Sequence, residues 1–322
     1  MNTALQKGFV SFSRSLMFFV LVGLSILLIG AHDVPAQRKR TVVVSVPAKS
    51  VTIQTEPEAI VWLDEVRRGV TDADGQFEIK DIKAGRHTLR LRASGYKEKT
   101  LALLASQRGQ LKVPLVRTTD QAELLFQQAE TAREKAKDDE ARKTVAELYR
   151  SALKIRPAFP AAHLGLARVL LDLNDYSSAL DEIAQARRTR PIYPEASAVE
   201  GRIQRMAAFV NEAIAAFRRS IREARGFQPE AHTGLALLFE EKGMNEEAVE
   251  EFRAALAQLS DTEPVLYQLL GAVYEKMLKY KEAVEAYEKY LQLAPEGSLA
   301  PAVRSIIDQL RRQAAEQETP SG

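Results

Sequence analysis

The chain has 322 residues, 46% of them hydrophobic and 27% charged, and this ordinary globular composition excludes a wholly disordered or collagen-like protein. Lys and Arg number 45 against 43 Asp and Glu, so the net charge of +2 lacks the basic excess of a nucleic-acid binder. The sequence has no cysteine, which excludes disulfides, thiolate metal sites and a cysteine nucleophile. The length predicts about two domains.

The first segment predicts export or membrane attachment. Basic residues precede an uncharged apolar run from Leu16 to Gly30, and a small-residue cleavage site follows. We interpret residues 1–36 as a signal peptide, because the run is shorter than the about 20 apolar residues of a spanning helix. The alternative is an uncleaved anchor formed by residues 16–31, which the positive charges of Arg38-Lys39-Arg40 favour. Either reading places the protein in the periplasm, the cell envelope or at the membrane, with residues 37–49 as a linker.

Residues 50–116 predict a small β-sandwich, because hydrophobic residues alternate with polar ones as in strands with one buried face. The alternating residues are Val51 and Ile53, Ile60 to Leu63, Phe77 and Ile79, His87, Leu89 and Leu91, and Leu111, Val113 and Leu115. Turn-forming sequences such as Asp72-Ala73-Asp74-Gly75 separate them. We expect Trp62 and Tyr96 to be buried. The solvated face is expected to carry Arg68, Lys80, Arg90, Arg92 and Lys112.

Several short motifs in this region occur in the order of a known family. They are Pro57-Glu58-Ala59 with Val61 and Leu63-Asp64, Gly69-x-Thr71, Gly85-x-His87-x-Leu89-x-Leu91 and Gly95-Tyr96. The region resembles the PEGA domain, a small β-sandwich found mostly in bacterial and archaeal envelope proteins, and the resemblance implies a structural or adhesive module without a catalytic site. It departs from that family at the opening motif, which lacks its Gly, and at Glu65, where a Gly is usual after Asp64.

Beyond residue 120 the hydrophobic period lengthens to about 3.6 residues, which indicates helices. Pro160, Pro194, Pro229 and Pro264 recur at spacings of 34, 35 and 35 residues, the signature of a repeat array. The unit after the last proline reads Tyr267, Leu270-Gly271, Tyr274, Ala283, Tyr287 and Pro295. This pattern resembles the tetratricopeptide repeat. We expect four to five such repeats over residues 120–296, the first one degenerate and behind a single long helix from about Asp120.

A terminal helix over residues 297–314 is expected to cap the array, and residues 315–322 to form a tail. The predicted fold class is therefore multidomain β plus α. A small PEGA-like β-sandwich precedes an all-α tetratricopeptide solenoid, with a signal or anchor helix at the N-terminus.

The tetratricopeptide resemblance implies a partner-binding groove, because in that family partner peptides lie along the concave surface made by the first helix of each repeat. The positions that carry over are Leu164, Arg168, Leu171, Asp172, Ala198, Arg202, Arg205, Thr233, Leu237, Glu240, Glu241, Gln268, Ala272, Glu275 and Lys276. We hypothesise that Arg168, Arg202 and Arg205 form the basic end of this groove. Residues 186–225 carry a net charge of +5 and residues 226–298 one of −8. We interpret this difference first as solvated outer helix faces, such as Arg187-Arg188 and Glu246-Glu247, that keep the array soluble. The alternative is a charge gradient that steers an oppositely patterned partner.

Motifs for catalysis or metal binding are not apparent in the sequence. His163 and His232 occupy positions usually held by a large aromatic residue and are expected to pack, and the Asp72–Gly75 segment is expected to be a turn rather than a calcium loop. We therefore predict no enzyme activity, cofactor, metal or nucleic-acid partner.

The predicted function is a non-catalytic scaffold or adaptor at the bacterial cell envelope. Its helical groove binds a protein or peptide, and the PEGA-like domain docks or orients it through a possible envelope or cell-wall contact. If the N-terminal segment is not cleaved, we also expect it to contact the membrane. The alternative is a cell-wall polysaccharide-binding module in which the β-domain binds glycan and the helices act as a spacer.

Overall fold

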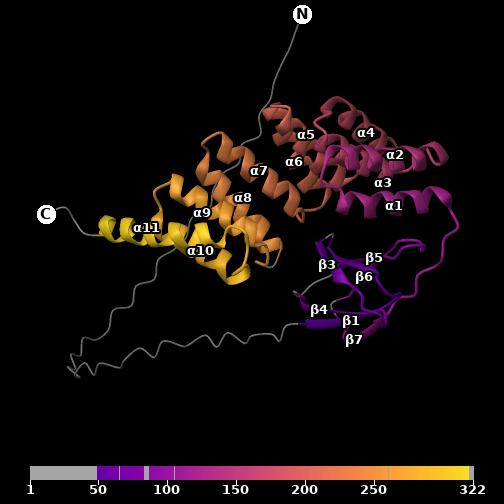
Figure 1. Cartoon of the computed structure of the whole chain (residues 1–322), viewed down its shortest axis with the longest axis horizontal. Helices are drawn as coiled ribbons and strands as arrows, with labels where there is room; N and C mark the ends of the chain where they lie inside the picture. The colour runs from indigo at the N-terminus through magenta and orange to yellow at the C-terminus, as the bar shows by residue number, and fades with distance from the viewer. Residues whose placement is uncertain (1–48, 65, 83–86, 105, 260, 319–322) are drawn as a thin grey trace, which may run out of the picture. The chain divides into compact units, whose positions relative to one another are not determined.

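The computed structural model describes residues 49–318 apart from 65, 83–86, 105 and 260 (Figure 1). The predicted leader or anchor therefore lies outside the described residues. The chain divides into two units, Met1–Pro47 and Ala48–Gly322, and the features below all belong to the second. Within its described part, no helix combines the length and apolarity needed to cross a membrane.

The described β region is a sandwich of two small sheets (Figure 1). Its strands are β1 (Lys49–Gln54), β2 (Ile60–Leu63), β3 (Val66–Val70), β4 (Gln76–Ile82), β5 (His87–Arg92), β6 (Lys99–Leu103) and β7 (Gly109–Lys112). One sheet has the order β4-β1-β7, with β1 antiparallel to β4 and parallel to β7, and the other has the order β3-β2-β5-β6. Val51 and Ile53 of the first sheet share a buried core with Val61, Leu89 and Leu91 of the second, as the alternating pattern predicted.

Two strands were not predicted from the sequence, and burial explains why. β3 is an edge strand without a buried residue, and in β6 only Leu103 is buried. A strand with so little buried surface leaves no clear alternation in the sequence. The Asp72 segment is a turn, as predicted, because the Asp72 carboxylate accepts the backbone N–H groups of Asp74 at 3.0 Å and Gln76 at 2.7 Å.

The rest of the described chain is helical and forms five consecutive antiparallel pairs followed by a last helix (Figure 1). The helices are α1 (Gln121–Lys135), α2 (Asp139–Ile155), α3 (Pro160–Asp172), α4 (Tyr176–Thr189), α5 (Pro194–Met206), α6 (Val210–Glu223), α7 (Pro229–Glu241), α8 (Asn245–Gln258), α9 (Pro264–Lys276), α10 (Tyr280–Leu293) and α11 (Ala300–Glu318). Each of the four repeating prolines is the first residue of a helix, where its missing N–H costs no helical hydrogen bond.

The first helical pair differs from the prediction of one long helix from about Asp120. Asp120 caps α1 by accepting N–H groups of Ala122 and Glu123, and the helix ends at Lys135. Asp138 then caps α2 by accepting the N–H of Ala141. Two acidic N-caps therefore begin two separate helices.

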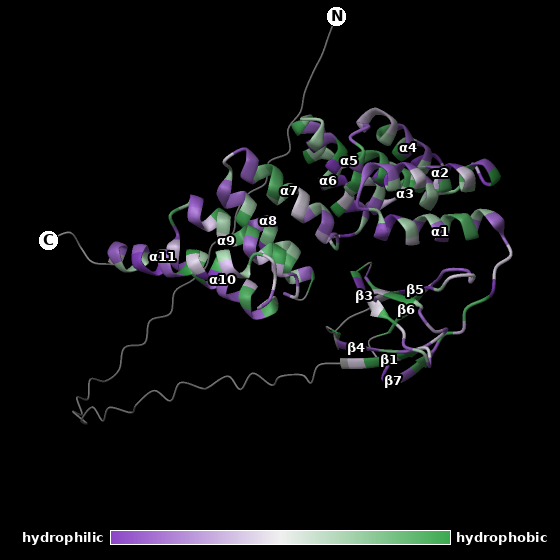
Figure 2. Cartoon of the chain, viewed as in Figure 1, coloured by the Kyte–Doolittle hydropathy of each residue, from purple (hydrophilic) through white to green (hydrophobic). Residues whose placement is uncertain are grey.

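The helices approach closely because small residues on one lie against aromatic rings on another. A Cβ at Gly201 would lie 2.6 Å from the ring of Phe217, and a Cβ at Gly234, one repeat further on, would lie 2.3 Å from the same ring. Phe217 is fully buried between them. Figure 2 shows the resulting pattern, with apolar residues between packed helices and polar residues outside. In α11, Val303, Ile307 and Leu310 are buried, and the helix runs beyond the predicted end at residue 314.

Four helical hairpins turn in the same way, with two backbone hydrogen bonds that close the end of the first helix. In the second of them the N–H of Ala208 donates to the carbonyl of Arg205 at 3.0 Å, and that of Phe209 to Gln204 at 2.8 Å. The residue at the left-handed position has a φ of 60° at Asn174, 63° at Ala208, 73° at Gly243 and 57° at Leu278. Only one of the four is glycine, the residue for which this conformation is least costly.

We expect the substitution Ala208→Gly to stabilise the protein, by roughly 0.5–1 kcal/mol, because it relieves a Cβ clash in the left-handed conformation. Ala208 is exposed, so the change removes little packing. Urea unfolding followed by circular dichroism measures the effect. The matched reverse change, Gly243→Ala, should destabilise by about the same amount, and a lower stability for Ala208→Gly would contradict this account of the turn.

His163 and His232 pack inside their hairpins, as predicted, but each is also hydrogen-bonded to a glutamate of the second helix. His163 Nδ1 lies 2.6 Å from Glu182 and His232 Nδ1 lies 2.6 Å from Glu251. His163 Nε2 also lies 2.8 Å from the carbonyl of Pro157. Burial lowers the pKa of His163, but the hydrogen bonds and the charge of Glu182 outweigh it, so the net pKa lies above the ordinary value.

We expect Glu182→Gln to destabilise the protein in a pH-dependent way. A raised folded-state pKa means that protonated His163 adds stability below its unfolded pKa of about 6.5, and that this stability is lost as the pH rises through the folded value. The difference in unfolding free energy between wild type and Glu182→Gln should therefore be largest below about pH 6.5 and shrink as the pH rises through the folded-state pKa of His163. Glu246→Gln, an exposed change on α8, is the control, and an equal pH profile for both variants would refute the pairing.

Candidate functional site

The first helices of the repeats form the inner face of the array. Helices α1, α3, α5 and α7 contact one another from repeat to repeat, whereas among the described second helices no comparably close contacts occur. An array whose first helices lie closer together curves with those helices on the inside. This inner face carries the positions predicted to bind a partner.

Those predicted positions are not equally accessible. Leu164, Leu171 and Ala198 are buried. Partly exposed are Arg168, Arg202, Arg205, Thr233, Leu237, Glu240, Gln268, Ala272 and Glu275, and the exposed positions are Asp172, Glu241 and Lys276. The two leucines therefore belong to the core, and a partner would meet mainly polar groups.

Ion pairs between neighbouring repeats join the charged groups of the inner face. Glu230 lies 3.7 Å from Arg168 and 3.3 Å from Arg202, so it bridges three first helices. Arg205 pairs with Glu241 in the next repeat.

Further along the inner face, Lys276 lies 2.5 Å from Glu240, and Glu275 accepts the hydroxyl of Tyr287. Because most of these side chains stay partly exposed, each pair contributes little stability. Their structural effect is that the three arginines of the predicted basic end already have carboxylate partners.

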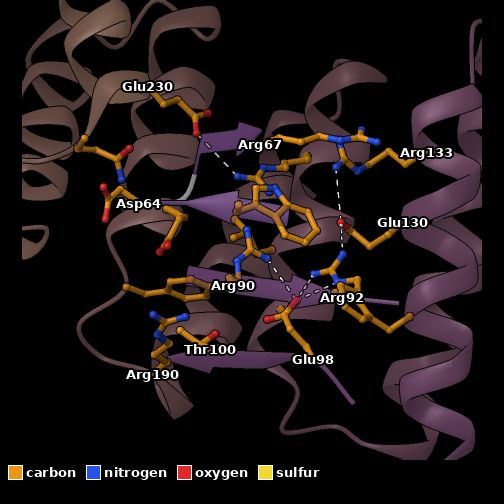
Figure 3. A pocket seen from close by; sticks show the side chains of 18 of the residues that line it. Asp64, Arg67, Arg90, Arg92, Glu98, Thr100, Glu130, Arg133, Arg190 and Glu230 are labelled. Carbon is orange, nitrogen blue, oxygen red and sulfur yellow. Dashed lines mark hydrogen bonds and ion pairs between the residues drawn. The ribbon is translucent and has the colours of Figure 1, made fainter. Parts of the chain in front are cut away.

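A cavity of about 470 Å³ opens beside this inner face, and we call it the junction pocket (Figure 3). Strands β2, β3, β5 and β6 form one wall, and helices α1 and α3 with the loops before α5 and α7 form the other. Its charged lining consists of Arg67, Arg90, Arg92, Arg133, Arg168, Arg190, Asp64, Glu98, Glu130, Glu134, Glu195 and Glu230. Its aromatic lining consists of Trp62, Phe126, Tyr193 and Phe227.

The strand wall corrects two predictions. Trp62 was expected to be buried, but in β2 it alternates with the core residues Val61 and Leu63 and so points away from the core. Arg90 and Arg92 were expected to be solvated, but their guanidinium groups lie 4.1 and 5.3 Å from the centre of the Trp62 ring. The outer face of this sheet is therefore covered by stacked arginines.

Glu130 connects the strand wall to the helices. Its carboxylate lies 3.1 Å from Arg92 of β5 and 3.6 Å from Arg133, and it accepts the hydroxyl of Tyr149 (Figure 3). Burial raises the pKa of Glu130, but the charges of Arg92 and Arg133 and the Tyr149 hydrogen bond lower it more, so it stays ionised. Burial and the Glu130 charge raise the pKa of Tyr149, which keeps its hydroxyl protonated.

A buried amide makes a second connection between the β region and α1. The side-chain oxygen of Gln127 accepts the N–H of Gly95 at 2.9 Å, and its amide nitrogen donates to the carbonyl of Tyr96 at 2.7 Å. Gln127 is only 6% exposed, so losing the Gly95 bond would leave its buried side-chain oxygen without a partner. The sequence did not predict this residue, because its partners lie more than 30 positions away.

The helical wall centres on Tyr193, in the loop before α5. Arg190 lies 4.1 Å from the centre of its ring. Burial and the charge of Glu195 raise the pKa of Tyr193 to about 12, against the opposing charges of Arg168, Arg190 and Arg90. The charges of three arginines from three segments thus act on the Tyr193 hydroxyl. The Oε2 atom of Glu195 is buried and has no hydrogen-bond partner among the residues that the structure describes.

The charged groups of the junction pocket are arranged in a way that suits recognition of charge. Among the described residues no group of three or more His, Asp or Glu side chains is placed to hold a metal ion. Guanidinium groups held flat on aromatic rings keep their N–H edges available for carboxylates.

Comparison with protein families identifies tetratricopeptide repeats in three stretches, residues 138–203, 199–264 and 264–296. No curated protein sequence matches the chain significantly. The matches lie outside the β region, so its resemblance to the PEGA domain stays a prediction.

Two solved structures with TM-scores above 0.5 support the same fold, and a third has a lower score. A chain of the Cut9–Hcn1 hetero-tetramer of APC/C is 16% identical with a TM-score of 0.52, the match covering 63% of this chain and 38% of that one. A structure of pilF from Pseudomonas aeruginosa is 16% identical with a TM-score of 0.51, covering 61% and 87%. TTC0263 from Thermus thermophilus is 21% identical with a TM-score of 0.48, covering 59% and 98%. From residue 138 to residue 296, the chain is an array of tetratricopeptide repeats.

Proposed function

We propose that this protein is a non-catalytic interaction scaffold whose inner helical face binds a protein or peptide partner. The observation that carries the proposal is the stack of five helix pairs, matched as tetratricopeptide repeats from residue 138 to residue 296, in which the first helices α1, α3, α5 and α7 contact one another in sequence. Helical repeat arrays use such extended concave surfaces for binding. The groups on this face bind through shape and charge.

We further propose that the scaffold works at the bacterial cell envelope. The support is the basic, apolar and small-residue order of residues 1–36, together with the PEGA-like motifs of the β region. In this proposal the β region orients the array. The ties from Glu130 and Gln127 to the β region give it a fixed attachment to α1.

The alternative, a polysaccharide-binding module, depends on an aromatic ring that is open for a sugar to stack on. Trp62 lies outside the β core, although the sequence predicted that it would be buried, and this position favours the alternative. Its ring, however, is covered by the guanidinium group of Arg90. We therefore prefer the protein partner.

The scaffold proposal predicts that a partner contacts the inner face in cells. A photoreactive residue at Glu241, exposed on the inner face of α7, should give a discrete crosslinked adduct that mass spectrometry identifies as protein. The same residue at Glu250, exposed on the outer helix α8, is the matched control and should give none. Adducts from Glu250 alone, or from neither position, would end the proposal.

The envelope proposal predicts a processed N-terminus. If the signal peptide is removed after Ala36, the mature chain begins at Gln37, and intact-mass measurement of the protein from the envelope fraction should show this. An intact N-terminus in the membrane fraction would instead support the anchor of residues 16–31. Recovery of the unprocessed chain away from the envelope would contradict both.

A further inference from the structure

Most of the charged side chains that line the junction pocket form ion pairs. Six arginines face six carboxylates. Glu98 pairs with Arg90 and Arg92, and Glu130 pairs with Arg92 and Arg133. The remaining strand-side and inner-face pairs are Arg67 with Glu134 at 3.1 Å, Asp64 with His87 at 2.5 Å, and Arg168 with Glu230 at 3.7 Å.

Two charged groups on the helical wall, Arg190 and Glu195, do not take part in these pairs, and their charges are opposite. Arg190 stacks on Tyr193 but makes no ion pair within the described part of the chain. Glu195 has a buried Oε2 atom without a donor. Arg168 adds further hydrogen-bonding capacity, because its pair with Glu230 is longer than a hydrogen bond.

Arg190, Arg168 and Glu195 define the chemistry of a complementary ligand. It must supply a carboxylate to the guanidinium groups of Arg190 and Arg168, and an N–H donor to Glu195. A peptide with an acidic side chain has both, the second from its backbone. A fully ionised polyanion lacks such a donor, and the extra negative charge of a polyanion or of free phosphate would face Glu195 and the other carboxylates unpaired.

We propose that the junction pocket is a binding site for a peptide segment that carries an acidic residue, with the β region supplying one wall. The site rests on the proposed scaffold function and extends it, because the binding surface then includes strands as well as helices. The acidic side chain lies between Arg190 and Arg168, and a backbone N–H of the same segment donates to Glu195. Trp62 with its stacked Arg90 forms the opposite wall.

The test uses the full chain and an array of octapeptides with Glu at the centre, varied flanks and blocked ends, next to the same peptides with Gln. We expect binding to a subset of the Glu peptides that their Gln counterparts lose. Arg190→Gln should weaken this binding about tenfold or more, the scale of a lost charge-assisted hydrogen bond. Arg218→Gln, an exposed change on the outer helix α6 without a described ion pair, is the matched control and should leave binding unchanged.

Arg190 is exposed, so its variant should fold as the wild type does, which circular dichroism checks. Glu195→Ala provides a second measurement and should also weaken the bound peptides. Equal binding of Glu and Gln peptides, or unchanged binding to Arg190→Gln, would overturn the site. So would displacement of the peptides by millimolar inorganic phosphate, which would indicate a simple anion site. If crosslinking at Glu241 still succeeds in any of these cases, the scaffold function stands and only the junction pocket falls.

Discussion

The close approach of glycine and alanine backbones to buried aromatic rings sets the geometry of the helical array. Phe217 lies between Gly201 and Gly234, which belong to first helices of successive repeats, so one ring fixes the spacing of both. Protein interiors pack too densely for such a ring to move without shifting its neighbours. That spacing then brings charged groups of neighbouring repeats together, as in Arg205 with Glu241 and Lys276 with Glu240, which are each 36 residues apart.

Attachment of the β region to α1 creates the junction pocket. Its two walls come from regions that the sequence predicted to be separate domains. Glu130 joins Arg92 of β5 to Arg133 and Tyr149, and Gln127 holds the backbone of Gly95 and Tyr96. Both attachments are charged or polar and largely buried. Removing one partner would leave the other without compensation, so they specify one arrangement more strongly than apolar contact does.

Charge compensation shapes what the inner face and the junction pocket can bind. The arginines predicted to form a free basic end are paired with Glu230 and Glu241. A partner that met only these groups would have to replace existing ion pairs, with little net gain. Arg190 and Glu195 differ, because neither has an ion-pair partner among the described residues, and this difference makes them a better basis for selectivity.

The sequence by itself determined the repeat architecture, because the period of 34 to 35 residues and the helix-starting prolines are local features that survive without contacts. It also determined the buried alternation of β1, β2, β4 and β5, but not the edge strand β3, which buries nothing. Only the tertiary structure decided that Trp62 faces outward, that Arg92 reaches Glu130, and that Arg190 has no ion-pair partner in the described part of the chain. Those outcomes depend on contacts between residues dozens of positions apart, and neither the hydrophobic period nor motif spacing encodes such distances.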